Sequence, residues 1–259
     1  MCIRDSPTSI GFYRDSGFLP KALVNYLCLM GWSMPDERDL FDLEEMVSEF
    51  DENRISTGGP IFDLKKLSWT NGQYIRNLSH DDFVEELTRQ MANPEKINQI
   101  VPLVRDRIER FDEVIGKADY LLGATPGIGS SDFEFTDLPD ELVGQILYIA
   151  VSSLEQLEDW QKDTIFDLFT RCAKYLDIDF KKFMKPIFVA ISGKRNSLPA
   201  FDSMAIMGKS VTVSRFRSAM EEVGLSGKKR KKVLKGNLTI YEILQIIPTD
   251  LPESLNTYI

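Results

Sequence analysis

Apolar residues recur at spacings of three and four along most of the chain, a pattern typical of helices that bury one face. We expect helices over residues 19–30, 138–158, 159–176, 212–223 and 239–247, and others that begin near Asp42, Asp63, Ser79 and Asn93. Residues 186–191 (PIFVAI) are a short apolar run for which periodicity leaves strand and buried helix open. Strand-like alternation is scarce elsewhere, so the sequence predicts a mainly α fold.

Local signals refine this pattern. Asp42 with Glu45 predicts a capping box, and Asp63 predicts an N-cap. The helix near Ser79 is expected to turn three apolar side chains inward, namely Phe83, Leu87 and Met91. From Asn93-Pro94 we expect a longer helix, which Pro102 should kink or interrupt. One apolar stripe along it is formed by Ile97, Val101, Val104, Ile108, Phe111 and Ile115.

One stretch breaks the helical pattern strongly enough to suggest a domain boundary. Residues 123–131 (GATPGIGSS) and the acidic run after them form the clearest linker. We place the boundary near residue 137. This stretch lacks the GK[ST] ending of a phosphate-binding loop, so a hinge is the better interpretation.

Charge is unevenly distributed along the 259 residues. Residues 1–185 contain 20 Lys/Arg against 34 Asp/Glu, a net charge of −14, whereas residues 186–259 contain 11 against 6, a net charge of +5. This asymmetry indicates nucleic acid as a partner of the basic end, and a solvated tail explains it nearly as well. The run KKRKK at 228–232 has the same two interpretations. No apolar stretch approaches the length of a membrane span.

Residues suited to catalysis are few. The chain has one histidine, His80, at an expected helix start, and three widely spaced cysteines without a CxxC pair. These numbers disfavour both a histidine-dependent catalytic triad and a zinc site, and the cysteines are expected to be reduced. On chemistry alone, the sequence predicts a helical binding module rather than an enzyme.

Residues 194–201 (KRNSLPAF) have the make-up of a nucleic-acid-binding loop. Lys194 and Arg195 could hold phosphates, and Phe201 could stack on an unpaired base. The alternative places Phe201 in the core with the cations solvated. Arg105, Arg107 and Arg110 alternate with acidic residues, which intrahelical ion pairs would also explain.

Three stretches together resemble bacterial-type glutamyl-tRNA synthetases of class I. Residues 7–33 are similar to the segment that follows the family's KMSKS-type loop, and residues 58–76 to its FDxxKLxWxNGxYI motif. Residues 186–220 resemble its closing anticodon-domain motif, although Phe188 stands where the family commonly has Arg. The HIGH and KMSKS-type motifs are absent from the sequence, so we expect a carboxy-terminal part that lacks the catalytic Rossmann domain and is inactive alone.

The resemblance implies a division into five parts. These are a non-native leader (1–6), a stem-contact region with minor β structure (7–80), two helical anticodon-binding subdomains (81–137 and 138–224) and a basic extension (225–259). It places the anticodon pocket at Ser197, Leu198, Ala200 and Phe201, beside Lys194 and Arg195, and implicates Arg105 or Arg107 in the first subdomain. No catalytic residue and no metal ligand is expected in this chain.

For the intact enzyme, the resemblance implies attachment of glutamate to tRNA through glutamyl-adenylate, with ATP and Mg²⁺. We expect a cytoplasmic monomer without membrane contact, whose partner is the glutamate-specific tRNA, with the glutamine-specific tRNA as a second candidate. One alternative is a free-standing helical module that binds RNA or protein. The glutaminyl enzyme is a third, disfavoured because that family binds the anticodon with β-barrels.

Overall fold

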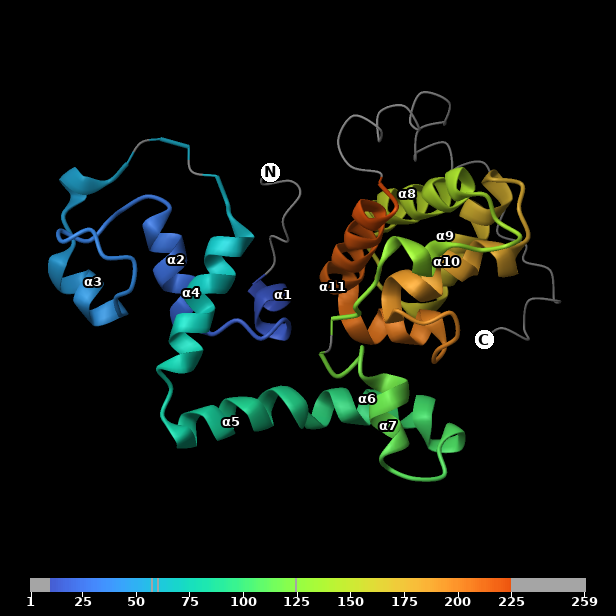
Figure 1. Ribbon diagram of the computed structural model, residues 1–259, viewed down its shortest axis with the longest axis horizontal. Coiled ribbons are helices and arrows are strands. Elements are labelled where there is room, and N and C mark those ends of the chain that lie inside the picture. Colours follow the sequence, from blue (N-terminus) through green and yellow to red (C-terminus); the bar gives the residue numbers. More distant parts are fainter. Residues whose placement is uncertain (1–9, 57, 60, 124, 225–259) are drawn as a thin grey trace. The chain divides into compact units, whose positions relative to one another are not determined.

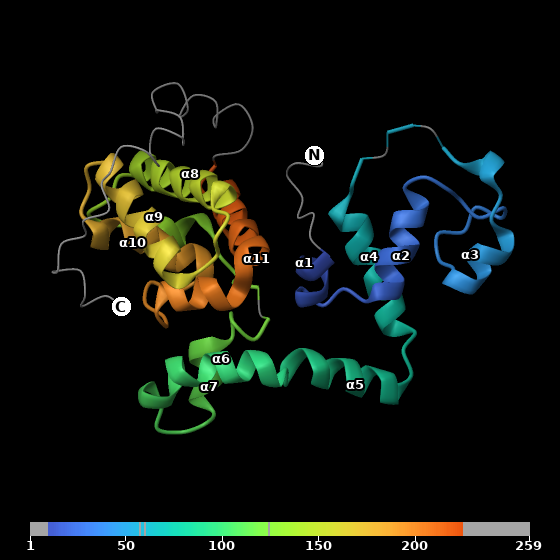
Figure 2. The ribbon, with the colours of Figure 1, turned by 180° about the vertical axis from the view of Figure 1, so that it is seen from behind.

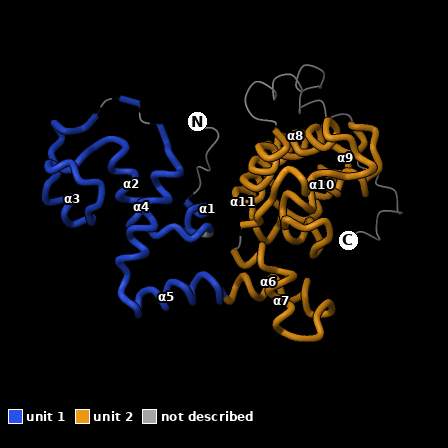
Figure 3. Tube along the Cα trace, in the orientation of Figure 1, with its two compact units in different colours: residues 1–93 blue, residues 94–259 orange. Residues whose placement is uncertain are grey.

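The computed structural model describes residues 10–56, 58–59, 61–123 and 125–224. The expected leader at 1–6, the run at 228–232, the helix expected at 239–247 and the rest of the extension lie outside the described residues. The chain divides into two compact units, residues 1–93 (unit 1) and 94–259 (unit 2), coloured separately in Figure 3.

Both units are helical (Figure 1). Unit 1 contains α1 (Ile10–Asp15), α2 (Pro20–Leu29), α3 (Leu43–Glu49), a 3₁₀ turn (Glu52–Arg54), α4 (Leu64–Arg76) and α5 (His80–Met91). Unit 2 contains α6 (Pro94–Val104), a 3₁₀ turn (Arg105–Arg107), α7 (Glu113–Ala118), a 3₁₀ turn (Ser130–Phe133), α8 (Asp140–Gln156), α9 (Lys162–Tyr175), α10 (Phe180–Ser192) and α11 (Ala200–Glu222). The mainly α prediction is confirmed.

The minor β structure expected for residues 7–80 is not found among the described residues of unit 1. The one isolated β-bridge described joins Phe135 to Leu138 in unit 2. In unit 1, much of the main chain is paired within helices and at their caps, as the sequence signals predict. Asp42 and Glu45 form the expected capping box, and Asp63 and Ser79 cap α4 and α5.

Buried polar side chains hold unit 1 together around α2 and α4. The Asn71 side-chain oxygen Oδ1 accepts from the Leu19 N–H at 2.8 Å, and the Tyr74 hydroxyl donates to the Asn25 side-chain oxygen at 2.9 Å. The Tyr26 hydroxyl accepts from the Asp63 N–H at 2.6 Å. Because an unpaired buried polar group costs about 1–3 kcal/mol, these bonds fix how the two helices face each other.

Unit 2 is a bundle in which α8, α9, α10 and α11 pack around one hydrophobic core, as both opposite views show (Figures 1 and 2). The run 186–191 is helical: it lies in α10, which contacts α8, α9 and α11, so few of its positions need to be polar. Lys209 donates to the carbonyls of Glu155 and Leu157 at the C-terminal end of α8, where a cation is favourable.

One expected buried face is exposed, and a second is exposed except at Val104 and Ile108. In α5, Phe83, Leu87 and Met91 are all exposed, since the described elements of unit 1 cover this face only in part. The expected stripe from Ile97 to Ile115 is not one helix: α6 ends at Val104, two residues after Pro102, which has no N–H for the helical ladder. No helix among the described residues is long and apolar enough to cross a bilayer.

The compact units divide at residue 93, not near residue 137. Residues from α6 and from the segment before α8, including Leu103 and Tyr120, share the core of α8–α11. The Arg215 guanidinium on α11 explains part of this union, because it donates to the carbonyls of Ile191 and, at 2.7 Å, Tyr120. The functional limits at 80, 137 and 224 that the resemblance implies stay predictions.

We expect Arg215→Ala to lower the free energy of unfolding by about 2–4 kcal/mol, because it leaves buried carbonyls without their donor. Chemical denaturation followed by circular dichroism measures this loss. The exposed Arg105→Ala is the matched control and should change stability by no more than about 0.5 kcal/mol. Equal stability of the two variants would contradict the role given to Arg215.

Candidate nucleic-acid interface

The loop between α10 and α11 is anchored at its first residue. Gly193 ends α10 in the left-handed conformation with φ of 69°, and its N–H donates to the Val189 carbonyl. A side chain there would also meet the Pro126 Cβ at 3.0 Å. Glycine therefore satisfies both the backbone conformation and the close approach of the residue 126 segment.

The two cations after Gly193 are engaged within unit 2. The Lys194 ammonium donates to Asp119 Oδ1 at 2.6 Å and to the Gly116 carbonyl at 2.7 Å, so it fastens the loop to the end of α7. Arg195 is exposed, lies over the Phe135 ring and donates to the Glu134 carbonyl at 2.8 Å. The Lys194 side chain therefore stabilises the fold, whereas the Arg195 guanidinium has further N–H donors that face solvent.

Of the two interpretations of Phe201, the structure agrees with the one that places it in the core, and a ring exposed for stacking is wrong. Phe201 is only 6% exposed, and its ring centroid lies 5.2 Å from that of Phe166 in an edge-on arrangement. Phe169 and Phe180 surround it further. Its place as the second residue of α11, on the side facing α9, puts the ring into the core, so neither face is open to a base.

The other residues assigned to the anticodon pocket are also largely covered. Leu198 and Ala200 are buried, and the half-buried Ser197 hydroxyl donates to the Leu198 carbonyl at 3.2 Å. Leu198 and Ala200 pack as core residues and offer no side-chain hydrogen bond, so any contact they make with RNA is apolar or through the main chain.

A buried polar network lies beneath this loop. The Tyr120 hydroxyl pairs with Ser203 Oγ at 2.7 Å, and Ser203 Oγ also donates to the Pro199 carbonyl at 2.8 Å. Burial raises the pKa of Tyr120 and lowers the pKa of Arg215 to about 10. At neutral pH Tyr120 is therefore neutral and Arg215 charged, which is the state that these hydrogen bonds require.

Arg105 and Arg107 lie together in the 3₁₀ turn after α6 and are exposed. Arg107 donates to the Leu103 carbonyl at 2.9 Å, which orients its guanidinium without neutralising it. Arg105 makes no hydrogen bond or ion pair with the described residues. Neither arginine forms the ion pair offered as an alternative with the described residues, so their role in binding RNA stays a prediction.

Phe111 follows these arginines and was missed as a surface residue. It is 89% exposed and is the one aromatic side chain in the exposed class among the described residues of unit 2. The turn is ordered: the Val114 N–H donates to the Phe111 carbonyl, and Arg110 pairs with Asp112 at 3.0 Å. The break at Pro102 is the sequence signal that could have removed Phe111 from the buried stripe.

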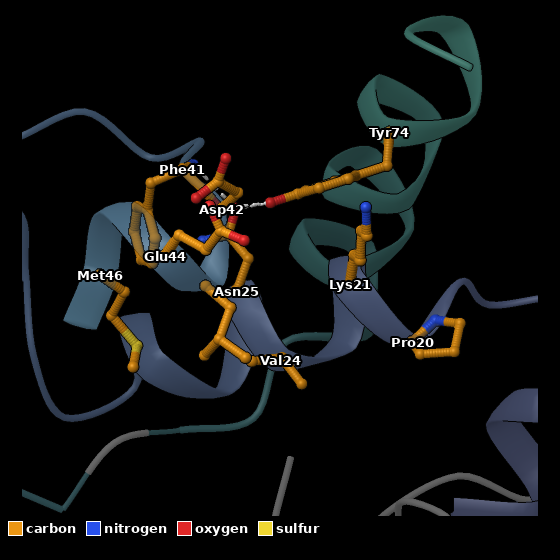
Figure 4. A pocket seen from close by; sticks show the side chains of 10 residues that line it. Pro20, Lys21, Val24, Asn25, Phe41, Asp42, Glu44, Met46 and Tyr74 are labelled. Atoms are coloured by element: carbon orange, nitrogen blue, oxygen red, sulfur yellow. Dashed lines mark hydrogen bonds between the residues drawn. The ribbon is translucent and has the colours of Figure 1, made fainter. Parts of the chain in front are cut away.

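Unit 1 contains an open pocket of about 440 Å³ between α2, α3 and α4 (Figure 4). Its polar side chains Asn25, which is buried, and Tyr74, which is half-buried, are paired with each other and with carbonyls of Asp39 and Phe41. Lys21 and Glu44 add charges of opposite sign to its lining. This arrangement selects no single class of ligand.

His80 is the first residue of α5 and is exposed, which fits a surface position better than a catalytic one. Burial raises the pKa of the Cys172 thiol to about 12, so this cysteine is inert at neutral pH. Among the described residues, no group of three or more His, Cys, Asp or Glu side chains is placed to hold a metal ion.

Two family models match the chain. The anticodon binding domain matches residues 82–220, and the catalytic domain of class I tRNA synthetases (E and Q) matches residues 1–69. These matches define the class of protein as a class I tRNA synthetase with a helical anticodon-binding domain. The stretch expected to be the stem-contact region thus falls largely within the catalytic-domain match.

Curated relatives specify the class further. The glutamate–tRNA ligase of Marinomonas sp. (strain MWYL1) is 42% identical over 230 residues, which are 88% of this chain and 47% of that protein. The glutamate–tRNA ligase of Marinobacter nauticus is 43% identical over 234 residues, 90% of this chain and 48% of that protein. The chain belongs to the glutamate–tRNA ligase family and spans about half the length of these relatives.

A solved structure is also similar. The crystal structure of a glutamate tRNA ligase from Elizabethkingia meningosepticum in complex with its amino acid is 24% identical, with a TM-score of 0.45. It covers 82% of this chain and 43% of that chain. The helical unit 2 and the family matches exclude the β-barrel expected of the glutaminyl enzyme for the described residues, and they favour a synthetase over an unrelated helical module.

We expect Phe201→Ala to destabilise unit 2 by about 3–5 kcal/mol, because it removes a ring from a packed aromatic cluster. Phe111→Ala should change stability by less than about 0.5 kcal/mol, since that ring has few neighbours. Thermal and denaturant unfolding of the two variants measures the contrast. A stable Phe201→Ala protein would show that the ring is not a core residue.

Proposed function

We propose that this chain is the tRNA-recognising part of a glutamate–tRNA ligase and that unit 2 holds the anticodon loop. The proposal is supported by the match of residues 82–220 to an anticodon-binding domain. The single observation that carries the site is the exposed Phe111, which follows the exposed cations Arg105 and Arg107 by six and four residues within that match.

The chemistry of this turn suits an unpaired RNA strand. Exposed guanidinium groups bind phosphates, and a flat aromatic ring gives a base a face on which to stack. Arg107 is oriented by the Leu103 carbonyl, and Phe111 is presented by a hydrogen-bonded turn, so little ordering is needed on binding. Arg195 in the loop after α10 is a further exposed cation of unit 2, and we propose that Ser197, Leu198 and Ala200 of this loop contact the RNA through apolar or main-chain groups.

In the whole enzyme, we propose that this recognition positions the 3′ end of tRNA for transfer of glutamate activated by ATP. Mg²⁺ would assist the activation step, and no ligand set for it is proposed among the described residues. The tRNA specific for glutamate is the proposed partner, with the glutamine-specific tRNA as a second candidate. A monomer in the cytoplasm is the proposed state of the protein.

We expect Phe111→Ala and the double variant Arg105→Ala/Arg107→Ala each to weaken binding of a glutamate-tRNA transcript by about 1–3 kcal/mol. The arginine variant should also reduce the dependence of log K on log salt, because fewer counterions are released. Titration by fluorescence anisotropy at several salt concentrations measures both effects.

The exposed Lys117→Ala, which removes a cation from the same region, is the control for net charge. Binding of a transcript with a scrambled anticodon loop gives the matching control on the RNA. The proposed anticodon site would be excluded if Phe111→Ala and Arg105→Ala/Arg107→Ala both bound the glutamate-tRNA transcript with wild-type affinity while unfolding like the wild type.

We also expect the chain to bind tRNA without catalysing ATP–pyrophosphate exchange, because the HIGH and KMSKS-type motifs are absent from its sequence. A radioactive exchange assay with glutamate, ATP and tRNA measures this activity against an intact family member. Exchange above background would contradict the assignment of this chain to recognition alone.

A further inference from the structure

Helix α11 is bent at one residue, Gly208. Its backbone torsions there are φ of 77° and ψ of 164°, whereas the residues on either side are helical. Figures 1 and 2 show the start and the end of α11 running in different directions. Glycine adopts a positive φ with little strain, so this residue type makes the bend possible. The bend divides α11 into residues 200–207 (the first arm) and 209–222 (the second arm).

The side chain of Thr212, one turn after the bend, is a buried polar group without a partner. Thr212 is 0% exposed, and its hydroxyl oxygen Oγ1 is the one buried side-chain nitrogen or oxygen without a hydrogen bond among the described residues. Burying a hydroxyl without a hydrogen bond is unfavourable, and most buried polar groups in folded proteins bind a protein atom or an ordered water molecule. The Thr212 hydroxyl therefore needs an explanation.

Two other buried threonines show what Thr212 lacks. The Thr170 hydroxyl donates to the Phe166 carbonyl, four residues earlier in the same helix, at 3.0 Å, and Thr70 makes the equivalent bond within α4. For Thr212 this acceptor would be the Gly208 carbonyl. In a regular helix ψ is about −42°, and the ψ of 164° at Gly208 turns its carbonyl away from that direction. The bend therefore explains why Thr212 lacks the usual acceptor.

Side chains from outside α11 hold the bend at two other points. The Met204 carbonyl, four residues before Gly208, accepts from the Trp160 indole N–H at 3.0 Å. The Lys209 ammonium, directly after Gly208, donates to two carbonyls at the end of α8. The Thr212 hydroxyl, by contrast, has no such partner from a neighbouring element among the described residues.

The space beside the bend suits a water molecule. Apart from the adjoining chain, no described atom lies within 4 Å of where a Cβ on Gly208 would be. Gly208 and Lys209 are half-buried, so solvent reaches this part of α11. A bound water needs room for one molecule and at least two polar partners. The Thr212 hydroxyl and the main-chain groups that the bend removes from the helical ladder can provide these partners.

We propose that the bend of α11 binds a water molecule, which bridges Thr212 Oγ1 to the main chain at Gly208. This water replaces the hydrogen bond to the fourth preceding carbonyl and stabilises the angle between the two arms. The first arm begins directly after the loop at 194–199, and the second arm carries Arg215. The water thus helps to fix this loop relative to the core of unit 2, whether or not unit 2 binds RNA.

The experiment removes the hydroxyl and counts bound water. Thr212→Val keeps a similar side-chain shape without the oxygen, whereas Thr212→Ser keeps the hydroxyl. Thr170→Val is the matched control, because that buried hydroxyl is paired within its own helix. Oxygen-17 magnetic relaxation dispersion counts the water molecules that a folded protein retains. We expect Thr212→Val to retain one water fewer than the wild type, and the two other variants to retain the same number.

The sign of the stability change is an independent test, measured by chemical denaturation. If the water is bound, Thr212→Val removes one of its partners, and the equilibrium constant for unfolding should rise about 5- to 30-fold. If the hydroxyl has no partner at all, the same substitution removes an unpaired buried polar group. The unfolding constant should then stay the same or fall.

An unchanged number of retained waters in Thr212→Val, or an unfolding constant that does not rise, would overturn the proposal. A crystal structure of the wild type adds a check that does not depend on any variant. A water within about 3.2 Å of both Thr212 Oγ1 and a main-chain atom of residues 207–210 would support the site. A direct hydrogen bond from the Thr212 hydroxyl to a protein atom would contradict it.

Discussion

The partly buried guanidinium of Arg215 is the constraint on which unit 2 depends. A cation removed from water is tolerated only when its donors find acceptors, and burial lowers the pKa of Arg215 to about 10. Its acceptors include the carbonyls of Tyr120 and Ile191, which belong to the segment before α8 and to α10. The two hydrogen bonds can form only when the segment before α8, α10 and α11 are packed together. These three parts of the chain therefore belong to one compact unit.

The same packing decides which surfaces are left for a partner. In the loop after α10, Lys194 is paired with Asp119 at the end of α7, and just beyond the loop Phe201 of α11 is buried among aromatic rings. The loop therefore serves chiefly to connect α7 and α11 within the fold. Beyond this loop, Arg105, Arg107 and Phe111 are exposed in unit 2. We therefore propose that RNA is recognised by exposed side chains that do not pack in the core.

Helix starts were predictable because capping is local. The Asp42 box and the Asp63 and Ser79 caps each need only a side-chain oxygen and a main-chain N–H two or three residues away. The family resemblance was equally predictable, because it depends only on the order of amino acids within short motifs. The apolar faces of α5 and of the segment around Phe111 were not, because an amphipathic pattern shows that a face exists and not what covers it.

The amino-acid sequence alone therefore determined the helical class, most helix starts and the synthetase family. Tertiary structure alone decided that Phe201 is a core residue and Phe111 a surface one, although both are phenylalanines close to arginines. It also joined residues 94–137 to the bundle of α8–α11. The physical reason is that burial depends on partners distant along the chain, and those partners are set by packing and by buried hydrogen bonds rather than by local periodicity.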